Sequence, residues 1–141
     1  MTEWNIEELI PHRVPFLLVD AITELVPGGS AKGYWDLTGD EEFFAGHFPG
    51  RPTLPGVLMI ESLAQLGAAC VLADERFTGR IPLFGGIDKA RFRRQVVPGD
   101  RLELDVAVVR ISTRAGTSHC IASVNGEVCC ELDLLFFMAP G

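Results

Sequence analysis

The sequence predicts a single α+β domain in which a curved antiparallel sheet wraps around one long, buried helix. An apolar run from Val57 to Ala73 is rich in helix-forming residues, whereas the last third of the chain alternates between apolar and polar residues. A helix that is apolar on nearly all sides needs burial around most of its circumference, which a curved sheet supplies. The 141 residues, 48% of them hydrophobic, have room for one domain, residues 1–141, with a sizeable core.

The first third of the chain predicts one short helix and two strands. Residues 5–10, NIEELI, form an amphipathic turn of helix that Pro11 ends. Residues 16–22, FLLVDAI, and 30–37, SAKGYWDL, are typical of strands, and the Pro-Gly-Gly turn at 27–29 separates them. We therefore expect an N-terminal helix followed by a hairpin.

The central helix is expected to begin at Pro55, whose fixed backbone suits a first helical turn, and to return to solvent at Asp74. Its apolar run approaches the length of a membrane span. It contains Glu61, Ser62 and Gln65, however, and the flanking segments lack a cytoplasmic excess of basic residues. The pattern favours a helix buried in protein, and no membrane contact is expected.

The C-terminal part of the chain predicts an antiparallel meander. Strict alternation over 101–109, RLELDVAVV, is typical of a half-buried strand that follows the turn at 97–100. Two further strands are expected at 117–124 and 127–137, joined by Asn125-Gly126, the strongest short hairpin signal.

The charge distribution limits the possible partners. A formal charge of −7 argues against a general nucleic-acid-binding protein, which neutralises phosphates with clustered Lys and Arg. Five of the twelve basic residues nevertheless fall within thirteen positions; they are Lys89, Arg91, Arg93, Arg94 and Arg101. This basic segment suits an acidic partner, although it could also be a solvated strand edge.

The cysteines and histidines do not predict a metal site. The cysteines, Cys70, Cys120, Cys129 and Cys130, form no C-x-x-C pair, and the two adjacent ones would point to opposite faces of a regular strand. His119 and Cys120 are also neighbours on a strand and diverge. We expect reduced thiols in the core and no metal or other cofactor. The acidic N-terminal segment lacks the features of a signal peptide, which predicts a cytoplasmic protein.

Three segments together resemble a known family. HRVPFLLVD at 12–20, GHFPGRPTLPGVLMIESLAQ at 46–65 and FGGIDKARFRRQVVPGD at 84–100 resemble the signature blocks of bacterial 3-hydroxyacyl-[acyl-carrier-protein] dehydratases of type II fatty acid synthesis. The likeness runs from about residue 10 to residue 138. It implies the hot dog fold and a homodimer with active sites shared between chains, with a trimer of dimers possible. It also implies an acidic acyl carrier protein as partner.

The chemistry of dehydration requires a base, an acid and donors for charge on the thioester oxygen. His47 is the histidine of the central block and imidazole titrates near neutral pH, so it can act as the base. Glu61 lies in the second turn of an apolar helix, where desolvation is expected to raise its pKa and make it an acid. Each could instead be structural, His47 as a lone histidine and Glu61 as a buried carboxyl paired with a nearby base. The family assigns the catalytic roles to both positions.

Other residues are candidates for binding substrate or carrier. Gly56 begins the helix, where free backbone N–H groups could bind the thioester oxygen, and the family assigns it this role. Gln65, one turn after Glu61, could orient its carboxylate. His12 and His119 are interpreted as structural. Candidates for lining an acyl tunnel are Phe48, Leu58, Ile60, Leu83, Phe84 and Ile87, each of which could be ordinary core. The carrier is expected to dock on Lys89, Arg91, Arg93 and Arg94.

The sequence departs from the family at one position and leaves three alternative functions open. Many members of the family have a tyrosine near the tunnel mouth where this chain has Pro82-Leu83, so gating and chain-length preference are open. A hot dog acyl thioesterase would use a helix carboxylate to activate water, but the GHFPG histidine argues against it. A non-catalytic acyl-binding subunit would be expected to lack His47 or Glu61, and both are present. A polyketide-type dehydratase shares the same pair.

Overall fold

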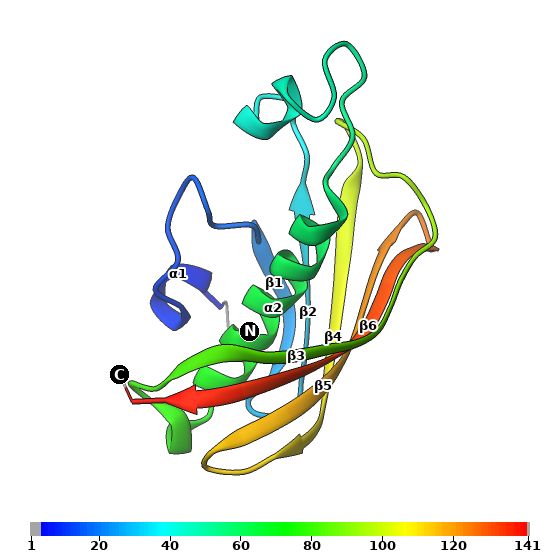
Figure 1. Ribbon diagram of the computed structural model, residues 1–141. Helices are drawn as coiled ribbons and strands as arrows, with labels where there is room; N and C mark the ends of the chain where they lie inside the picture. The colour runs from blue at the N-terminus through cyan, green and yellow to red at the C-terminus, as the bar shows by residue number, and fades with distance from the viewer. Residues whose placement is uncertain (1–3, 141) are drawn as a thin grey trace.

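The computed structural model describes residues 4–140, which form a six-stranded antiparallel sheet around the long helix α2 (Figure 1). The elements in chain order are α1 (Ile6–Leu9), β1 (Ala21–Val26), β2 (Ser30–Asp36), η1 (Glu42–Ala45), α2 (Gly56–Leu72), η2 (Glu75–Phe77), β3 (Ile81–Phe92), β4 (Arg101–Ile111), β5 (Ala115–Val124) and β6 (Glu127–Ala139). The strand order is β1-β2-β4-β5-β6-β3, so β1 and β3 are the two edges. This confirms the predicted α+β class.

The sheet curls around α2, with β1, β2 and β4 running along the helix and β6 and β3 crossing it at a large angle (Figure 1). Alternate residues of β4 point to the core, where Leu102, Leu104 and Val106 are buried as the alternation predicted. β5 is buried at every second residue in the same way. The concave face of the sheet therefore supplies most of the burial that a helix apolar on nearly all sides requires.

The predicted hairpin between β5 and β6 is confirmed. Asn125 and Gly126 both have positive φ, 51° and 82°, as a two-residue turn of type I′ requires. Helix α2 also begins where expected, directly after Pro55, and ends at Leu72. Among the described residues, no helix combines the length and hydropathy that a membrane crossing needs.

The predicted strand at 16–22 is wrong in its first five residues, because β1 begins only at Ala21. The backbone of Phe16 and Leu18 bonds to polar side chains of α2 instead of a neighbouring strand. The Leu18 N–H donates to Gln65 Oε1 at 2.7 Å, and the Leu18 carbonyl accepts from Ser62 Oγ at 2.7 Å. Residues 16–18 therefore form an extended segment that covers one side of the helix.

The four cysteines are free and buried, as predicted. The expectation that Cys129 and Cys130 point to opposite faces assumed a regular strand. Between Ala122 and Ser123 the register of β5 on β6 shifts from Cys130 to Val128, so Cys129 lies in a bulge and both thiols are buried. Burial raises the pKa of Cys70, Cys120 and Cys130 to about 11, which keeps these thiols protonated and unreactive.

Candidate active site

A pocket lies between α2 and the sheet, and its lining changes from polar to apolar along the helix. His12, Glu61 and Gln65 line it together with small residues of α2, Ala64, Gly67 and Ala68, and with Val71. The remaining lining residues come from β3 to β6 and are Pro82, Leu83, Phe84, Val108, Ser118, Leu134 and Phe136. From Glu61 to Val71 the pocket follows the helix for about 15 Å, at about 1.5 Å per residue. This shape suits a narrow apolar chain with a reactive group near Glu61.

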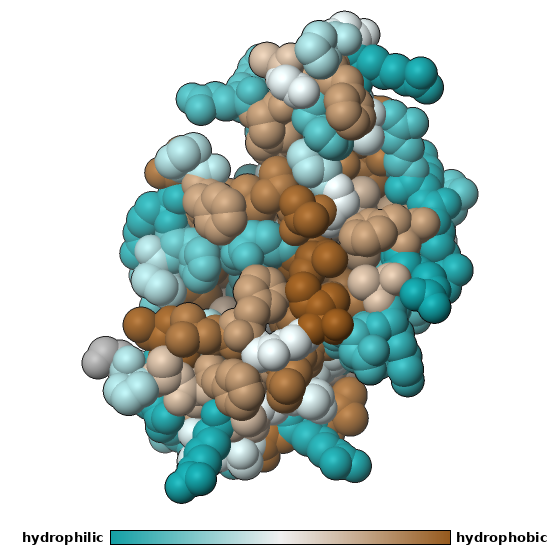
Figure 2. Space-filling model, in the orientation of Figure 1, coloured by the Kyte–Doolittle hydropathy of each residue, from teal (hydrophilic) through white to brown (hydrophobic). Residues whose placement is uncertain are grey.

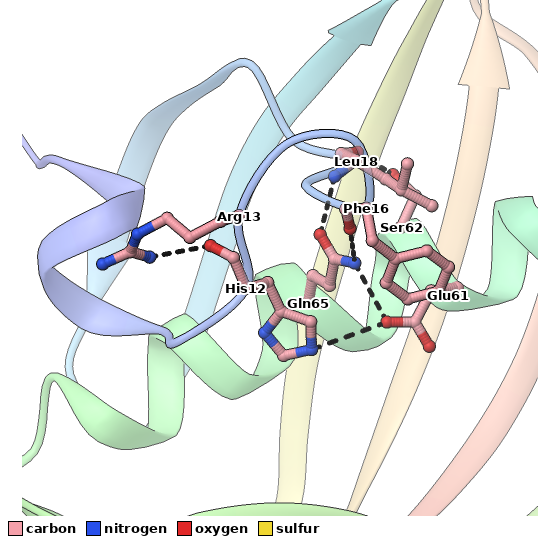
Figure 3. Close-up of polar contacts among 7 residues, drawn as sticks. All are labelled: His12, Arg13, Phe16, Leu18, Glu61, Ser62 and Gln65. Atoms are coloured by element: carbon pink, nitrogen blue, oxygen red, sulfur yellow. Dashed lines mark hydrogen bonds and ion pairs between the residues drawn. The ribbon is translucent and has the colours of Figure 1, made fainter. Parts of the chain in front are cut away.

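Glu61 is oriented by Gln65, which lies one turn further along α2 (Figure 3). Gln65 Nε2 donates to Glu61 Oε2 at 3.0 Å and to the Phe16 carbonyl at 2.8 Å. Gln65 is 1% exposed and the Glu61 side chain 17% exposed, so the carboxyl lies at the boundary between core and solvent. Gln65 therefore lies on the same face of α2 as Glu61 and contacts its carboxylate.

His12, which sequence reasoning interpreted as structural, lines the same pocket as Glu61. The loop after α1 brings its ring to Glu61, with 3.8 Å between His12 Nε2 and Glu61 Oε2 (Figure 3). No helical or strand periodicity relates residue 12 to residue 61, so spacing could not reveal the contact. A usable signal was the polar group Glu61, Ser62 and Gln65 on an apolar helix, since buried polar side chains require partners from another segment.

His47 lies on the loop between η1 and α2, which extends past the N-terminal end of the helix (Figure 1). Its Nδ1 is 2.8 Å from the Thr53 carbonyl oxygen. Because a carbonyl only accepts, Nδ1 holds the ring proton and Nε2 keeps a free lone pair. The ring of Phe48 stacks on His47 with 4.0 Å between centroids, and Phe48 is 52% exposed.

Within one chain the structure does not bring the two predicted catalytic groups together, since His47 is not part of the lining of the Glu61 pocket. Of the predicted tunnel residues, Leu83 and Phe84 line that pocket. The other four do not line it in the single chain. Phe48 is exposed on the loop before α2, Ile87 is exposed on β3, Ile60 belongs to the core, and Leu58 packs against the core. Pro82 and Leu83, at the position of the family's tyrosine, form part of the pocket wall.

Gly56 is the first residue of α2, so its N–H has no acceptor within the helix. The ring of Phe92 lies directly over it, and a Cβ at Gly56 would be 2.8 Å from Phe92 Cε1. Because Gly56 has no side chain, the Phe92 ring of β3 can pack directly against its backbone in the single chain. The predicted role of the Gly56 N–H in binding the thioester oxygen therefore depends on where the Phe92 ring lies.

The basic segment is only partly available to a partner. Arg93 pairs with Glu131 at 3.6 Å, Arg94 with Glu127 at 3.0 Å and Arg101 with Asp36 at 2.7 Å. Lys89 and Arg91 are exposed on β3 and have no ion pair with any described residue. The predicted docking set thus contains two unpaired cations and two that balance acidic neighbours.

Comparisons with known proteins agree with this architecture. A family model described as a FabA-like domain matches residues 10–133. The chain is 54% identical over 132 residues to the 3-hydroxyacyl-[acyl-carrier-protein] dehydratase FabZ of Clostridium botulinum, covering 94% of this chain and 92% of that protein. It is 53% identical to the protein of the same name from Clostridium novyi, with 94% and 93% covered.

Solved structures show the fold. A dehydratase heterocomplex, ApeI:P from Xenorhabdus doucetiae, matches with a TM-score of 0.81 at 15% identity, over 97% of this chain and 92% of that one. A hypothetical thioesterase with coenzyme A from Streptococcus pneumoniae matches with a TM-score of 0.66 at 10% identity, over 84% of both chains. With a long helix wrapped by a six-stranded antiparallel sheet, a FabA-like model over most of its length and FabZ relatives above 50% identity, the chain belongs to the FabA-like family of the hot dog fold.

Proposed function

We propose that this protein is a 3-hydroxyacyl-[acyl-carrier-protein] dehydratase that forms trans-2-enoyl thioesters in fatty acid biosynthesis. The observation that supports this most directly is Glu61, an oriented carboxyl in a pocket whose lining along the following turns of α2 is mostly apolar. A 3-hydroxyacyl chain would place its hydroxyl near the carboxyl and its alkyl part along the helix. The names of the relatives above 50% identity specify the same substrate class.

The two catalytic groups would divide the proton transfers. His47 Nε2, with its lone pair free because Nδ1 faces the Thr53 carbonyl, removes a proton from C2 of the acyl chain. Glu61 donates a proton to the hydroxyl at C3, the C3–O bond breaks, and water leaves. The electron pair from the C2–H bond forms the new double bond. Transfer of the proton from His47 back to Glu61, through solvent, restores the enzyme.

We infer that each active site is shared between two chains of a homodimer. One chain leaves His47 outside the Glu61 pocket, and β3 is an edge strand with several exposed apolar side chains, among them Leu83, Ile87 and Phe92. Figure 2 shows a band of hydrophobic surface on the face that β3 crosses in Figure 1. A second chain placed there would cover this band and bring its own loop to the pocket. Dimers could assemble further into a trimer of dimers, as the family resemblance implies.

In such a dimer, the N–H of Gly56 would bind the thioester oxygen and Phe48 would contact the acyl chain. Val57, next to Gly56, is 71% exposed and Phe48 is 52% exposed, which would leave both positions open to a partner chain. These roles require the Phe92 ring to leave space for the thioester or to lie beside it. The positive end of the helix dipole would favour charge on the oxygen.

The acyl carrier protein would dock near Lys89 and Arg91, with Arg93 and Arg94 contributing at the margin. Carrier proteins of this pathway are acidic, and unpaired cations attract an acidic surface more strongly than cations that already neutralise a neighbour. The reaction needs no cofactor, and we propose that it takes place in the cytoplasm.

The test is product analysis. The protein is incubated with 3-hydroxyacyl-carrier thioesters of several chain lengths, and products are separated by mass. A loss of water with the thioester intact supports the dehydratase. Free acid would point to a thioesterase, and unchanged substrate bound with high affinity would point to a non-catalytic acyl-binding subunit. Turnover limited to branched or short polyketide intermediates would move the protein to a specialised pathway.

A further inference from the structure

The contact between His12 and Glu61 goes beyond the pair of groups needed for dehydration. His12 Nε2 and Gln65 Nε2 approach the same oxygen, Glu61 Oε2, at 3.8 Å and 3.0 Å (Figure 3). No described residue gives Glu61 Oε1 a hydrogen bond. The two oxygens of this carboxyl group therefore have different environments.

The backbone of residues 16–18 fixes the orientation of the Gln65 amide. Leu18 N–H needs an acceptor, and Gln65 Oε1 accepts from it at 2.7 Å. The Phe16 carbonyl needs a donor, and Gln65 Nε2 donates to it at 2.8 Å. A flipped amide would place N–H against N–H and oxygen against oxygen. The second proton of Nε2 consequently points to Glu61 Oε2. The carbonyl oxygen of a carboxylic acid is a better acceptor than its hydroxyl oxygen, so this hydrogen bond favours the acid proton on Oε1.

The surroundings of the His12 ring favour one of its two neutral tautomers. Its Nδ1 is buried and has no hydrogen-bond partner among the described residues. A buried N–H without an acceptor is costlier than an unused lone pair, so the neutral ring favours the tautomer with its proton on Nε2. That N–H faces Glu61 Oε2. At 3.8 Å the contact is electrostatic, and a shift of about 1 Å when substrate binds would make it a hydrogen bond.

The backbone around His12 is held in place by its neighbour. Arg13 Nη1 donates to the Ile10 and His12 carbonyls at 2.9 Å and 2.7 Å, and Nη2 donates to the Glu7 carbonyl at 2.9 Å. The turn that follows α1 is therefore closed by the guanidinium group. The His12 ring is presented to α2 from a fixed loop.

We propose that His12 is a positioning residue for the acid Glu61. Together with Gln65 it keeps Oε2 as an acceptor, so that the transferable proton is on Oε1, and it stabilises the carboxylate that remains after the proton is donated. This inference rests on the proposed dehydratase function, since it assigns His12 an effect on one proton-transfer group of that reaction.

The effect is measured with a small 3-hydroxyacyl thioester, which avoids the carrier surface. His12→Ala is expected to lower kcat by about 10- to 100-fold with KM changed less than about 3-fold, because orientation of an acid acts on the chemical step. His12→Gln, which can supply an amide N–H in a similar place, is expected to recover most of the loss. His119→Gln is the matched control on the outer face of β5, and its turnover should equal that of the unaltered protein.

A double-mutant cycle separates positioning from structural damage. If His12 acts through Glu61, His12→Ala causes no further loss in a Glu61→Gln background. An equal loss in both backgrounds, or full turnover by His12→Ala, would overturn the proposal. If His12→Ala does not fold, His12→Leu fills the space without an N–H and takes its place in the cycle. Absence of dehydration by the unaltered protein would reject the proposed function itself, which is a distinct outcome.

Discussion

The ring of Phe92 occupies the space that a side chain at Gly56 would need. A Cβ at Gly56 would come within 2.8 Å of Phe92 Cε1 and 3.0 Å of Cδ1. The contact joins the first residue of α2 to the end of β3, the edge strand. The packing at the start of α2 therefore depends on one exposed aromatic residue.

Gly56→Ala is therefore expected to destabilise the protein by about 1–3 kcal/mol, the usual cost of forcing a group into an occupied site. Phe92→Leu should remove the clash. Gly56→Ala should therefore lower the unfolding free energy less in the Phe92→Leu background than in the unaltered protein. Denaturant unfolding of the four proteins measures this coupling. Strictly additive changes in unfolding free energy would show that the ring simply moves aside.

His47→Ala and Glu61→Gln should each reduce dehydration by about a hundred- to ten-thousandfold, because each removes one proton-transfer group. His47 is half-buried on a loop and the Glu61 side chain is 17% exposed, so neither change should prevent folding. Turnover of a small thioester and the thermal unfolding midpoint are measured for each variant. Near-normal turnover by either one contradicts the assigned role.

Mixing these two inactive variants tests the shared site. A hybrid dimer of one His47→Ala chain and one Glu61→Gln chain would have one site that lacks both groups and one that is intact. Random reassortment makes about half the dimers hybrid, so about a quarter of normal activity should return. One variant is tagged to confirm chain exchange after co-refolding. Demonstrated hybrids without activity would mean that each site lies within one chain.

Lys89→Glu with Arg91→Glu should weaken turnover of carrier-linked substrate and spare a small thioester, since the charges would attract only the protein partner. Reversal of Arg93 and Arg94 is a poorer test because it also breaks their pairs with Glu131 and Glu127. Arg110→Glu with Arg114→Glu changes the net charge equally at exposed positions outside the basic segment. Equal losses for both double variants would indicate a general effect of charge.

His119 provides a test of stability against pH. Its hydrogen bond to Asp133, at 2.7 Å, and a second one to Glu131 raise its pKa above the ordinary value of 6.5. A raised folded pKa contributes stability that is complete below about 6.5 and is lost as pH rises through the folded pKa. The side chain is 41% exposed, so solvent screening limits the effect to roughly 0.5 kcal/mol. His119→Gln should therefore destabilise the protein more at pH 6 than at pH 9 in urea titrations. A loss that does not vary with pH would exclude the ionic contribution.

The sequence by itself determined those features that depend on residues close together in the chain. Alternation in β4, the Asn125-Gly126 turn and the uninterrupted apolar run of α2 each predicted their element, because side-chain period and turn geometry are local properties. Glu61 and Gln65, one helical turn apart, could be placed on a common face for the same reason. The three family blocks identified the family, which the FabA-like match over residues 10–133 then supported.

Only the tertiary structure decided which distant groups meet. Ser62 and Gln65 of α2 form hydrogen bonds with the backbone of Leu18, so residues 16–18 do not pair with a neighbouring strand and β1 begins later than predicted. The same loop places His12 beside Glu61. Likewise, only the folded chain leaves His47 on a loop beyond the helix end, apart from the pocket that Glu61 lines. Contacts across about fifty residues arise because buried hydrogen-bonding groups must find partners, and no local pattern states which partner lies in reach.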